Sequence, residues 1–102
     1  MYSLSYLPGF RKDLEAIVDY ITTALEAPKA ALDLLDAVEQ TCQNLMQFPF
    51  AHRLFQFPKP IDTEYRVLPV KNYLVFYTVA DMTIEIHRII YKKRNLPQLI
   101  TE

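Results

Sequence analysis

Residues 65–91 of the chain read YRVLPVKNYLVFYTVADMTIEIHRIIY, and this stretch decides the fold. It is rich in valine, isoleucine, tyrosine and phenylalanine, which are enriched in β-strands. Three strands are predicted, at Tyr65–Val70, Tyr73–Val79 and Thr83–Tyr91. The segments between them, Lys71-Asn72 and Ala80-Asp81-Met82, are short enough to be hairpin turns. The stretch therefore predicts an antiparallel meander of three strands.

The last of these strands predicts two unlike faces for the sheet. Because side chains alternate between faces, Ile84, Ile86 and Ile90 should lie on one face. The other face would carry Thr83, Glu85, His87, Ile89 and Tyr91. Arg88 falls on the apolar side, which predicts either a β-bulge there or a place at the edge of the core. We expect the first face to be core and the second to be an open, solvated binding surface.

Helical spacing replaces strand spacing upstream. After a predicted strand at Tyr2–Leu7, Pro8 and Gly9 interrupt the chain. Apolar residues then recur every three or four positions, at Phe10, Leu14, Ile17, Ile21 and Leu25. Pro28 opens a second helix that ends near Phe48-Pro49. Its apolar stripe consists of Ala31, Leu34, Leu35, Val38, Cys42, Leu45 and Met46. Two amphipathic helices with so short a connection are predicted to form an antiparallel hairpin.

These elements together predict an α+β fold of the order β-α-α-β-β-β, in one domain that spans residues 1–102. The helical hairpin is expected to pack on one face of a mostly antiparallel C-terminal sheet, because each has an apolar side that needs a partner. Residues 49–63 are aperiodic and are predicted to form a long loop. Loops of that length are uncommon and are often functional.

Composition narrows the class of protein. The 102 residues are 51% hydrophobic and 23% charged, as in a globular protein. No apolar run is long enough to span a bilayer, no secretory signal is visible, and the single cysteine, Cys42, can form no internal disulfide. We therefore expect a cytoplasmic protein with no membrane partner. The sequence has no motif typical of a metal site, a phosphate-binding glycine loop or a nucleophile elbow, so no metal and no cofactor are expected.

The net charge of −1 hides an asymmetry between the two halves of the chain. Residues 1–51 carry three basic and seven acidic side chains, whereas residues 52–102 carry eight basic and five acidic side chains. Local fields rather than the average charge hold polyanions such as RNA. The second half of the chain can therefore present a basic surface.

The order of the elements and three blocks of sequence resemble the RelE/ParE superfamily of bacterial toxins. The first block is DLEAIVDYI in the first helix, residues 13–21. The second is the opening of the next helix, Pro28-Lys29-Ala30-Ala31, with Leu45 and Phe48-Pro49 at its end. The third comprises the strand segments YRVL at 65–68, NYLVFY at 72–77 and IHRIIYKKR at 86–94. The resemblance covers nearly the whole chain.

The resemblance implies the toxin of a type II toxin–antitoxin system, a growth inhibitor that a cognate antitoxin neutralises. RelE-like members cleave mRNA in the ribosomal A site without a metal, and ParE-like members inhibit DNA gyrase and are not nucleases. Our first hypothesis from the sequence is a ribosome-dependent mRNA endoribonuclease. The alternatives are a gyrase inhibitor, which the opening and the length of the hairpin favour, and a toxin fold that has lost activity and only binds its antitoxin.

The nuclease hypothesis implies three catalytic residues, Arg66, Tyr91 and Arg94. Attack of a ribose 2′-hydroxyl on the adjacent phosphate requires proton transfer and stabilisation of negative charge on phosphorus. Arg66 and Arg94 would bind phosphate oxygens, and Tyr91 would donate a hydrogen bond to phosphate or stack on a base. The ordinary interpretations are a surface salt bridge for Arg66, a rim aromatic for Tyr91 and a solvated basic tail around Arg94.

The resemblance and the charge asymmetry also imply RNA-binding residues, namely His87, Arg88, Lys92 and Lys93. A histidine suits acid–base chemistry, although an ordinary half-exposed strand residue is the alternative for His87. Within residues 49–63 the only lysine is Lys59, fewer basic residues than strongly active RelE-like nucleases carry, which weakens the case for catalysis.

Three partners are expected. The first is the antitoxin, whose C-terminal segment would fold on binding and wrap the helical hairpin and the sheet. The others are the ribosome with its mRNA or, in the alternative, DNA gyrase.

Overall fold

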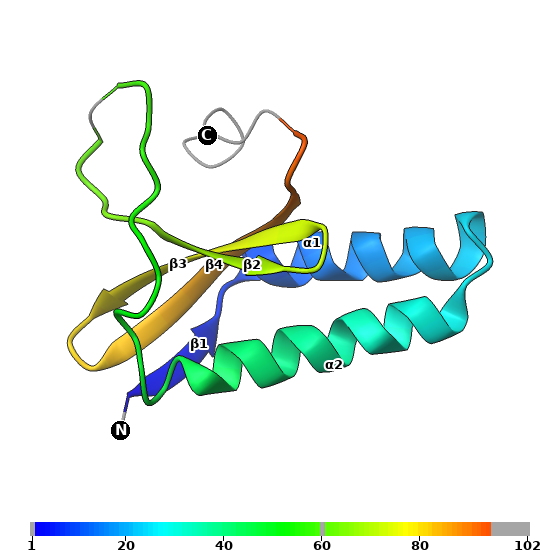
Figure 1. Cartoon of the computed structure of the whole chain (residues 1–102), viewed down its shortest axis with the longest axis horizontal. Helices are drawn as coiled ribbons and strands as arrows, with labels where there is room; N and C mark the ends of the chain where they lie inside the picture. The colour runs from blue at the N-terminus through cyan, green and yellow to red at the C-terminus, as the bar shows by residue number, and fades with distance from the viewer. Residues whose placement is uncertain (1, 60, 95–102) are drawn as a thin grey trace.

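The helices and strands follow one another in the predicted order β-α-α-β-β-β (Figure 1). The computed structural model describes residues 2–59 and 61–94 of the chain. The helices are α1 (Pro8–Asp19), a short π-helix η1 (Tyr20–Ala24) and α2 (Pro28–Asn44). The strands are β1 (Ser3–Tyr6), β2 (Arg66–Val70), β3 (Tyr73–Ala80) and β4 (Thr83–Tyr91). The predicted α+β fold is confirmed.

The strands form one sheet in the order β1-β4-β3-β2. β3 pairs antiparallel with β2 and with β4, which confirms the meander, and β1 pairs parallel with β4. The turn between β3 and β4 has two residues, Asp81 and Met82, with φ of 51° and 63°. Two left-handed residues give a hairpin turn the twist that the flanking strands require. The turn is one residue shorter than predicted because Ala80 belongs to β3.

The first helix begins earlier than predicted, because Pro8 opens α1 instead of interrupting the chain. Proline suits the first helical turn, where its missing N–H has no helical partner to lose. Gly9 lets this turn approach β4 closely. A Cβ atom on Gly9 would lie 3.1 Å from Arg88 Cδ and 3.2 Å from the carbonyl oxygen of His87. A side chain at this position would press on the strand.

The first helix also ends differently from the prediction, in the wider turn of η1. The N–H of Leu25 donates to the carbonyl oxygen of Tyr20, five residues earlier, at 3.1 Å. Leu25, the last member of the predicted apolar stripe, is 54% exposed, so the stripe leaves the core before its end. Glu26 then adopts φ of 50°, and α2 runs back beside α1, which confirms the hairpin (Figure 1). None of the helices in the described part of the chain is long and apolar enough to cross a membrane.

The main core lies between the helical hairpin and one face of the sheet. The predicted helical stripes supply Phe10, Ile21, Ala31, Leu34, Val38, Cys42 and Leu45, all buried. The sheet supplies Leu68, Val70, Val75, Tyr77, Ile84, Ile86 and Ile89. Tyr77 is the largest of the fully buried side chains, and its hydroxyl donates to the carbonyl oxygen of Pro49 at 2.9 Å. The one polar group of that side chain is therefore satisfied.

A β-bulge interrupts β4 where the sequence placed Arg88 on the wrong face. The register between β3 and β4 shifts, so that Phe76 lies opposite Arg88 and Tyr77 opposite Ile86. His87 is the extra residue. The bulge that the alternation predicted as one explanation for Arg88 is confirmed.

The bulge changes which isoleucines share a face. Ile89, predicted on the polar face, lies in the main core with Ile84 and Ile86. Ile90, predicted beside those two, lies in a second cluster on the other face of the sheet. The prediction for both residues was wrong because one extra residue reverses the alternation for the rest of the strand.

The second face of the sheet is partly covered, and not open as predicted. Its buried cluster consists of Val67, Phe76 and Ile90. Phe55 and Phe57 of the long loop pack against it, and the ring of Phe55 lies edge-on to that of Phe76 at 5.1 Å between centroids. The backbone N–H of Phe55 donates to the carbonyl oxygen of Tyr65 at 2.8 Å, which holds the loop beside β2. Apolar side chains on this face need cover, and the loop supplies it.

Candidate functional site

Arg66, the first predicted catalytic residue, opens β2 and pairs with Tyr77 of β3. Its Nη1 donates to the carbonyl oxygen of His52 in the long loop, at 2.8 Å. Its Cζ lies 5.0 Å from the ring centroid of Phe50, close enough for a cation–π contact. These contacts direct the guanidinium towards the loop and fasten the loop to the sheet.

Tyr91 and Arg94 lie together at the other end of the sheet. Tyr91 ends β4, and its ring centroid is 5.9 Å from that of Tyr73 in the next strand. The backbone N–H of Arg94 donates to the carbonyl oxygen of Tyr91 at 3.0 Å. Both side chains line a pocket of about 520 Å³. Its other lining residues are Ala16, Ile17, Tyr20 and Tyr73.

The sheet keeps Arg66 apart from Tyr91. Arg66 on β2 is paired with Tyr77 of β3, and Tyr91 on β4 is paired with Tyr73 of β3. Arg66 and Tyr91 are therefore separated by four residues along the strand direction and by two strand spacings across the sheet. At about 3.3 Å per residue and about 4.8 Å per strand, their Cα atoms are roughly 16 Å apart. Both residues alternate onto the hairpin face, where core side chains fill the space between them. Those side chains are Leu68, Val75 and Ile89. The described structure therefore brings together Tyr91 and Arg94, and not Arg66.

His87, predicted to bind RNA, lies on the face that the loop covers. Its Nε2 is 2.9 Å from Oγ1 of Thr78, and its ring lies edge-on to that of Tyr65 at 5.1 Å. Burial lowers the pKa of His87, and the charge of Glu85 opposes this in part. The imidazole therefore offers a hydrogen bond, rather than a positive charge, at neutral pH.

Arg88 joins the sheet to the first helix. Its Nε donates to Oδ2 of Asp13 at 2.6 Å, and its Nη2 donates to Oδ1 of Asp13 at 3.0 Å. The backbone N–H of Ile89 adds a third hydrogen bond to Oδ2 of Asp13, at 3.1 Å. The guanidinium that was predicted to bind RNA therefore forms a bidentate ion pair inside the protein.

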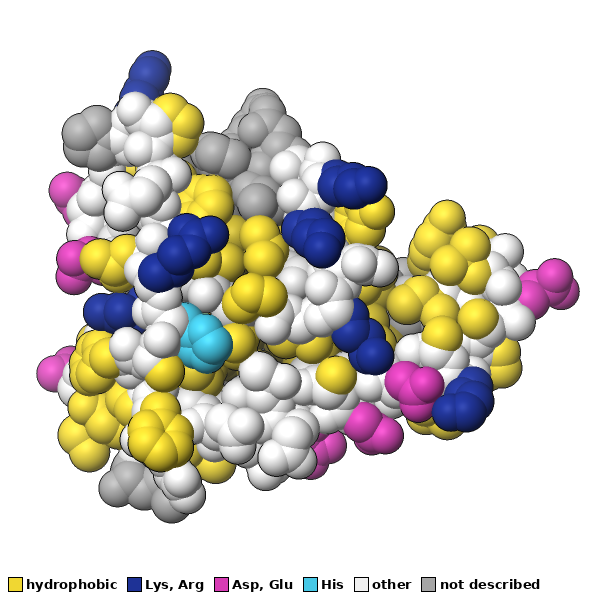
Figure 2. Space-filling view, viewed as in Figure 1, with side chains coloured by type: hydrophobic (Ala, Val, Ile, Leu, Met, Phe, Trp, Pro, Cys, Tyr) yellow, Lys and Arg dark blue, Asp and Glu magenta, His cyan; other side chains and the backbone are white. Residues whose placement is uncertain are grey.

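Lys92 and Lys93, the remaining predicted RNA-binding residues, are exposed in the turn after β4. The N–H of Lys92 donates to the carbonyl oxygen of Asn72 at 3.1 Å, so this turn lies beside the turn between β2 and β3. Figure 2 shows lysine and arginine side chains gathered where these turns lie in Figure 1. The end of the sheet next to Tyr91 and Arg94 is therefore basic.

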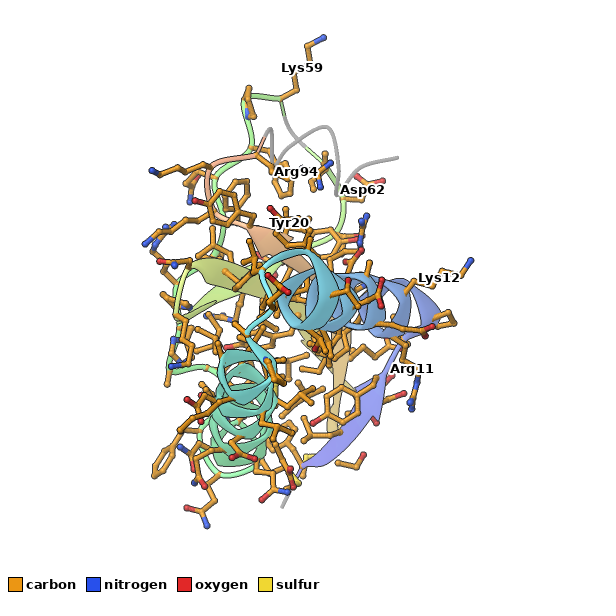
Figure 3. All side chains as sticks on the ribbon, turned by 90° about the vertical axis from the view of Figure 1, so that its right-hand side faces the viewer. Arg11, Lys12, Tyr20, Lys59, Asp62 and Arg94 are labelled. Atoms are coloured by element: carbon orange, nitrogen blue, oxygen red, sulfur yellow. The ribbon has the colours of Figure 1, made fainter. Side chains whose placement is uncertain are left out.

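A wide apolar groove of about 800 Å³ runs along the helical hairpin. Its apolar lining consists of Tyr6, Phe10, Leu14, Val18, Leu35 and Val38. Its polar lining consists of Arg11, Glu15, Glu39 and Gln43. Figure 3 shows Arg11 beside β1, between the levels of the two helices. The groove has the shape and lining of a protein-binding surface that takes an extended or helical segment.

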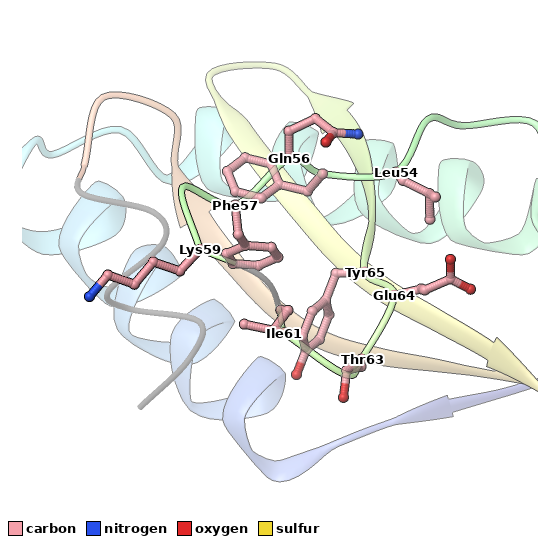
Figure 4. A pocket seen from close by; sticks show the side chains of 9 residues that line it. Leu54, Gln56, Phe57, Lys59, Ile61, Thr63, Glu64 and Tyr65 are labelled. Carbon is pink, nitrogen blue, oxygen red and sulfur yellow. The ribbon is translucent and has the colours of Figure 1, made fainter.

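A third pocket lies inside the long loop and holds about 190 Å³. Figure 4 shows Phe57, Ile61 and Tyr65 around its centre, with Lys59 pointing away. The volume is smaller than that of most small-molecule sites. Within residues 2–59 and 61–94, no three histidine, cysteine or acidic side chains are grouped as a metal site would require.

Two groups of residues at these sites were missed by the sequence analysis. Tyr20 and Tyr73 complete the pocket of Tyr91 and Arg94, and Asp13 holds Arg88. The predicted turn of three residues would place Tyr73 opposite Ile89, so the pairing of Tyr73 with Tyr91 could not be read from the sequence. The shorter turn and the bulge at His87 together move Tyr91 into this register. The contact of Asp13 with Arg88 had no local signal, because 75 positions separate the two residues.

Comparison with known proteins agrees with the fold. A chain of a solved structure described as the chromosomal ParDE TA system from P. aeruginosa superposes with a TM-score of 0.70. It is 24% identical, and the match covers 89% of this chain and 96% of that chain, so it shows a shared fold. No curated protein matches the chain. The model of the family "ParE toxin of type II toxin-antitoxin system, parDE" matches residues 4–96, which include every described helix and strand except the first residue of β1. The chain therefore belongs to the ParE toxins of type II toxin–antitoxin systems.

Proposed function

We propose that this toxin stops growth in the cytoplasm by binding DNA gyrase, without cleaving RNA, and that a cognate antitoxin neutralises it. The separation of Arg66 from Tyr91 and Arg94 carries this choice. A nuclease must hold its proton-transfer groups and its phosphate clamp around a single phosphate. An arginine whose Cα atom lies roughly 16 Å from that of Tyr91, with packed core between the two residues, does not support that arrangement.

A binding inhibitor needs no such convergence of side chains. It needs an exposed surface with anchoring side chains, and the helical hairpin offers Leu25 and Leu32, which are 54% and 62% exposed. Membership of the ParE family supports gyrase as the target. The endoribonuclease remains the alternative, and the close placement of Tyr91, Arg94 and the exposed lysines is the observation that favours it.

Two assays on the purified toxin separate these functions. In the first, gyrase supercoils a relaxed plasmid in the presence of rising toxin concentrations. In the second, the toxin is added to a cell-free translation reaction, and mRNA 5′ ends are mapped by primer extension. We expect supercoiling to be inhibited and the mRNA to stay intact. Prior addition of the antitoxin should restore supercoiling.

The variant Arg66→Ala makes the comparison sharper. Because we place Arg66 in the support of the long loop, this variant should inhibit gyrase to a similar extent as the unchanged toxin. New ribosome-dependent cuts in the reading frame, lost in Arg66→Ala, would establish the nuclease instead. Normal supercoiling together with intact mRNA would leave a toxin fold that only binds its antitoxin.

The apolar groove of the hairpin is the proposed seat of the antitoxin. It is the largest of the three concave surfaces described above, and its apolar floor would otherwise stay in contact with water. An antitoxin segment that folds on binding gains its affinity by covering such a surface. We propose that the C-terminal segment of the antitoxin lies in the groove and continues along the sheet.

A further inference from the structure

Three tyrosines from three separate elements meet in the pocket that Arg94 lines. Tyr20 begins η1, Tyr73 begins β3, and Tyr91 ends β4. Tyr73 and Tyr91 lie directly opposite each other in register, with ring planes inclined at 66°. Figure 3 shows the side chains of Tyr20 and Arg94 near each other at this end of the molecule. Tyr20 is 57% exposed and Tyr91 is 40% exposed, so aromatic surface gathers here outside the core.

The pocket offers hydrogen-bond donors. Burial raises the pKa of Tyr73, and the nearby hydroxyls of Tyr91 and Tyr20 raise it further. The Tyr73 hydroxyl therefore stays protonated at neutral pH and can donate to an anion. The guanidinium of Arg94 adds a fork of N–H donors and takes part in no salt bridge within residues 2–59 and 61–94.

Among the residues that the structure describes, the acidic side chain nearest to these donors already has other partners. Asp13 is the acidic residue that lines the adjoining pocket of about 150 Å³. Its carboxylate already accepts three hydrogen bonds, from Arg88 and from the N–H of Ile89. An anion from outside would therefore be the partner that complements Arg94.

The surroundings of the pocket are basic as well. Lys92 and Lys93 directly precede Arg94, and Lys71 lies in the neighbouring turn next to Asn72, which the N–H of Lys92 contacts. All three lysines are exposed. A group of cations around aromatic rings is the combination that binds nucleic acid strands, because phosphates pair with the cations and bases stack on the rings.

We propose that this pocket binds a nucleoside phosphate unit, with the phosphate on Arg94 and the base against the rings of Tyr20 and Tyr91. A volume of about 520 Å³ is large enough for a nucleotide. An acidic peptide would use the cations, but it would leave the tyrosine rings without a planar partner. Inhibition of gyrase does not require this pocket, so the two proposals stand or fall separately.

The test measures fluorescence anisotropy of labelled single strands of about ten nucleotides, in DNA and RNA forms of one sequence. A fluorescent adenosine monophosphate and a labelled polyglutamate peptide serve as further probes. The full-length toxin is compared with Arg94→Ala, Tyr20→Ala and Lys12→Ala. Lys12→Ala is the matched control because it removes one exposed cation that lines none of these pockets (Figure 3). Circular dichroism verifies that each variant is folded.

We expect the strands to bind at physiological salt, with affinity reduced roughly tenfold in Arg94→Ala, since one charge-assisted contact is lost. Tyr20→Ala should weaken binding by about fivefold or more through lost stacking. Lys12→Ala should stay within about twofold, as an exposed distant charge does. If the monophosphate binds as well as the strands, the natural ligand is a free nucleotide. A preference for DNA or for RNA strands identifies the nucleic acid.

Three results would overturn the proposal. The first is the absence of measurable binding to any nucleotide probe. The second is an equal loss of affinity in Arg94→Ala and Lys12→Ala, which would show an unspecific attraction between charges. The third is tighter binding of polyglutamate than of the nucleotide probes, which would assign the pocket to an acidic protein partner.

Discussion

Arg88 shows how the surroundings of a single residue decide its role. From the sequence it is a cation in a basic strand end, and RNA binding was the natural interpretation. In the fold it lies opposite the first helix, where Asp13 accepts hydrogen bonds from its Nε and Nη2 at 2.6 and 3.0 Å. Both side chains are mostly covered, with 29% and 17% of their surfaces exposed. An ion pair in such a place is costly to break, because the partner that remains is left without compensation.

Asp13→Ala should therefore lower the free energy of unfolding by about 2 kcal/mol, less than the loss for a fully buried ion pair, because water reaches part of both side chains. The matched control is Asp33→Ala, which breaks the exposed pair of Lys29 and Asp33 at 3.4 Å. The control should change stability by less than about 0.5 kcal/mol, because solvent screens that pair. Urea denaturation followed by circular dichroism measures both values. Equal effects of the two substitutions would show that the contact of Asp13 with β4 contributes no more to the free energy of unfolding than an exposed ion pair does.

At the scale of elements, the predicted bounds of each strand differ from the observed bounds by at most one residue. Alternating side chains and many β-branched and aromatic residues are a strong signal for a strand. Errors arose where one residue changed the geometry. The bulge at His87 moved Ile89 and Ile90 to the faces opposite to those predicted. The cover of Phe55 and Phe57 was missed because an aperiodic loop gives no signal of the face that it will contact.

The end of the first helix holds another such local feature. η1 is followed by Glu26 at φ of 50°, and the N–H of Ala27 donates back to the carbonyl oxygen of Ile21 at 3.0 Å. This is the place after a helix where glycine is preferred, because a Cβ atom crowds the left-handed backbone. The hairpin tip therefore carries a small strain that comes from one side chain.

Glu26→Gly should raise the free energy of unfolding by about 0.5–1 kcal/mol, since the relief of the left-handed penalty exceeds the entropy that glycine adds. Glu15→Gly removes the same side chain from an exposed position inside α1, and it should lower stability by about 1 kcal/mol. Thermal unfolding of the two variants gives the comparison. A loss of stability in Glu26→Gly would mean that the Glu26 side chain contributes a contact that outweighs its strain.

At the scale of the whole molecule, three surfaces are distributed over one small fold. The helical hairpin presents an apolar groove, the end of the sheet near Arg94 is basic and aromatic, and the far end holds Arg66 against the loop. The sequence identified Arg66, Tyr91 and Arg94 as chemically capable residues, but it could not give the distance between them. That distance follows from strand register and from which face each residue occupies, and both are properties of the assembled sheet.

The groove leads to a prediction that concerns the antitoxin. Leu35 is half-buried in the groove wall, whereas Leu32, on the same helix, is 62% exposed and does not line the groove. Leu35→Asp should weaken antitoxin binding by about a hundredfold, because it places a charge in a surface that the antitoxin must desolvate. Leu32→Asp should change affinity by less than about threefold, as substitutions outside the contact usually do.

Isothermal titration of each folded variant with the cognate antitoxin gives both affinities, and circular dichroism establishes that Leu35→Asp retains the hairpin. Coupled folding predicts a negative heat-capacity change of binding, which Leu35→Asp should make smaller, since less apolar surface is buried. If both variants bind as tightly as the unchanged toxin, the antitoxin lies elsewhere. The groove would then stay uncovered in the complex, and the antitoxin would neutralise the toxin by binding to the sheet alone.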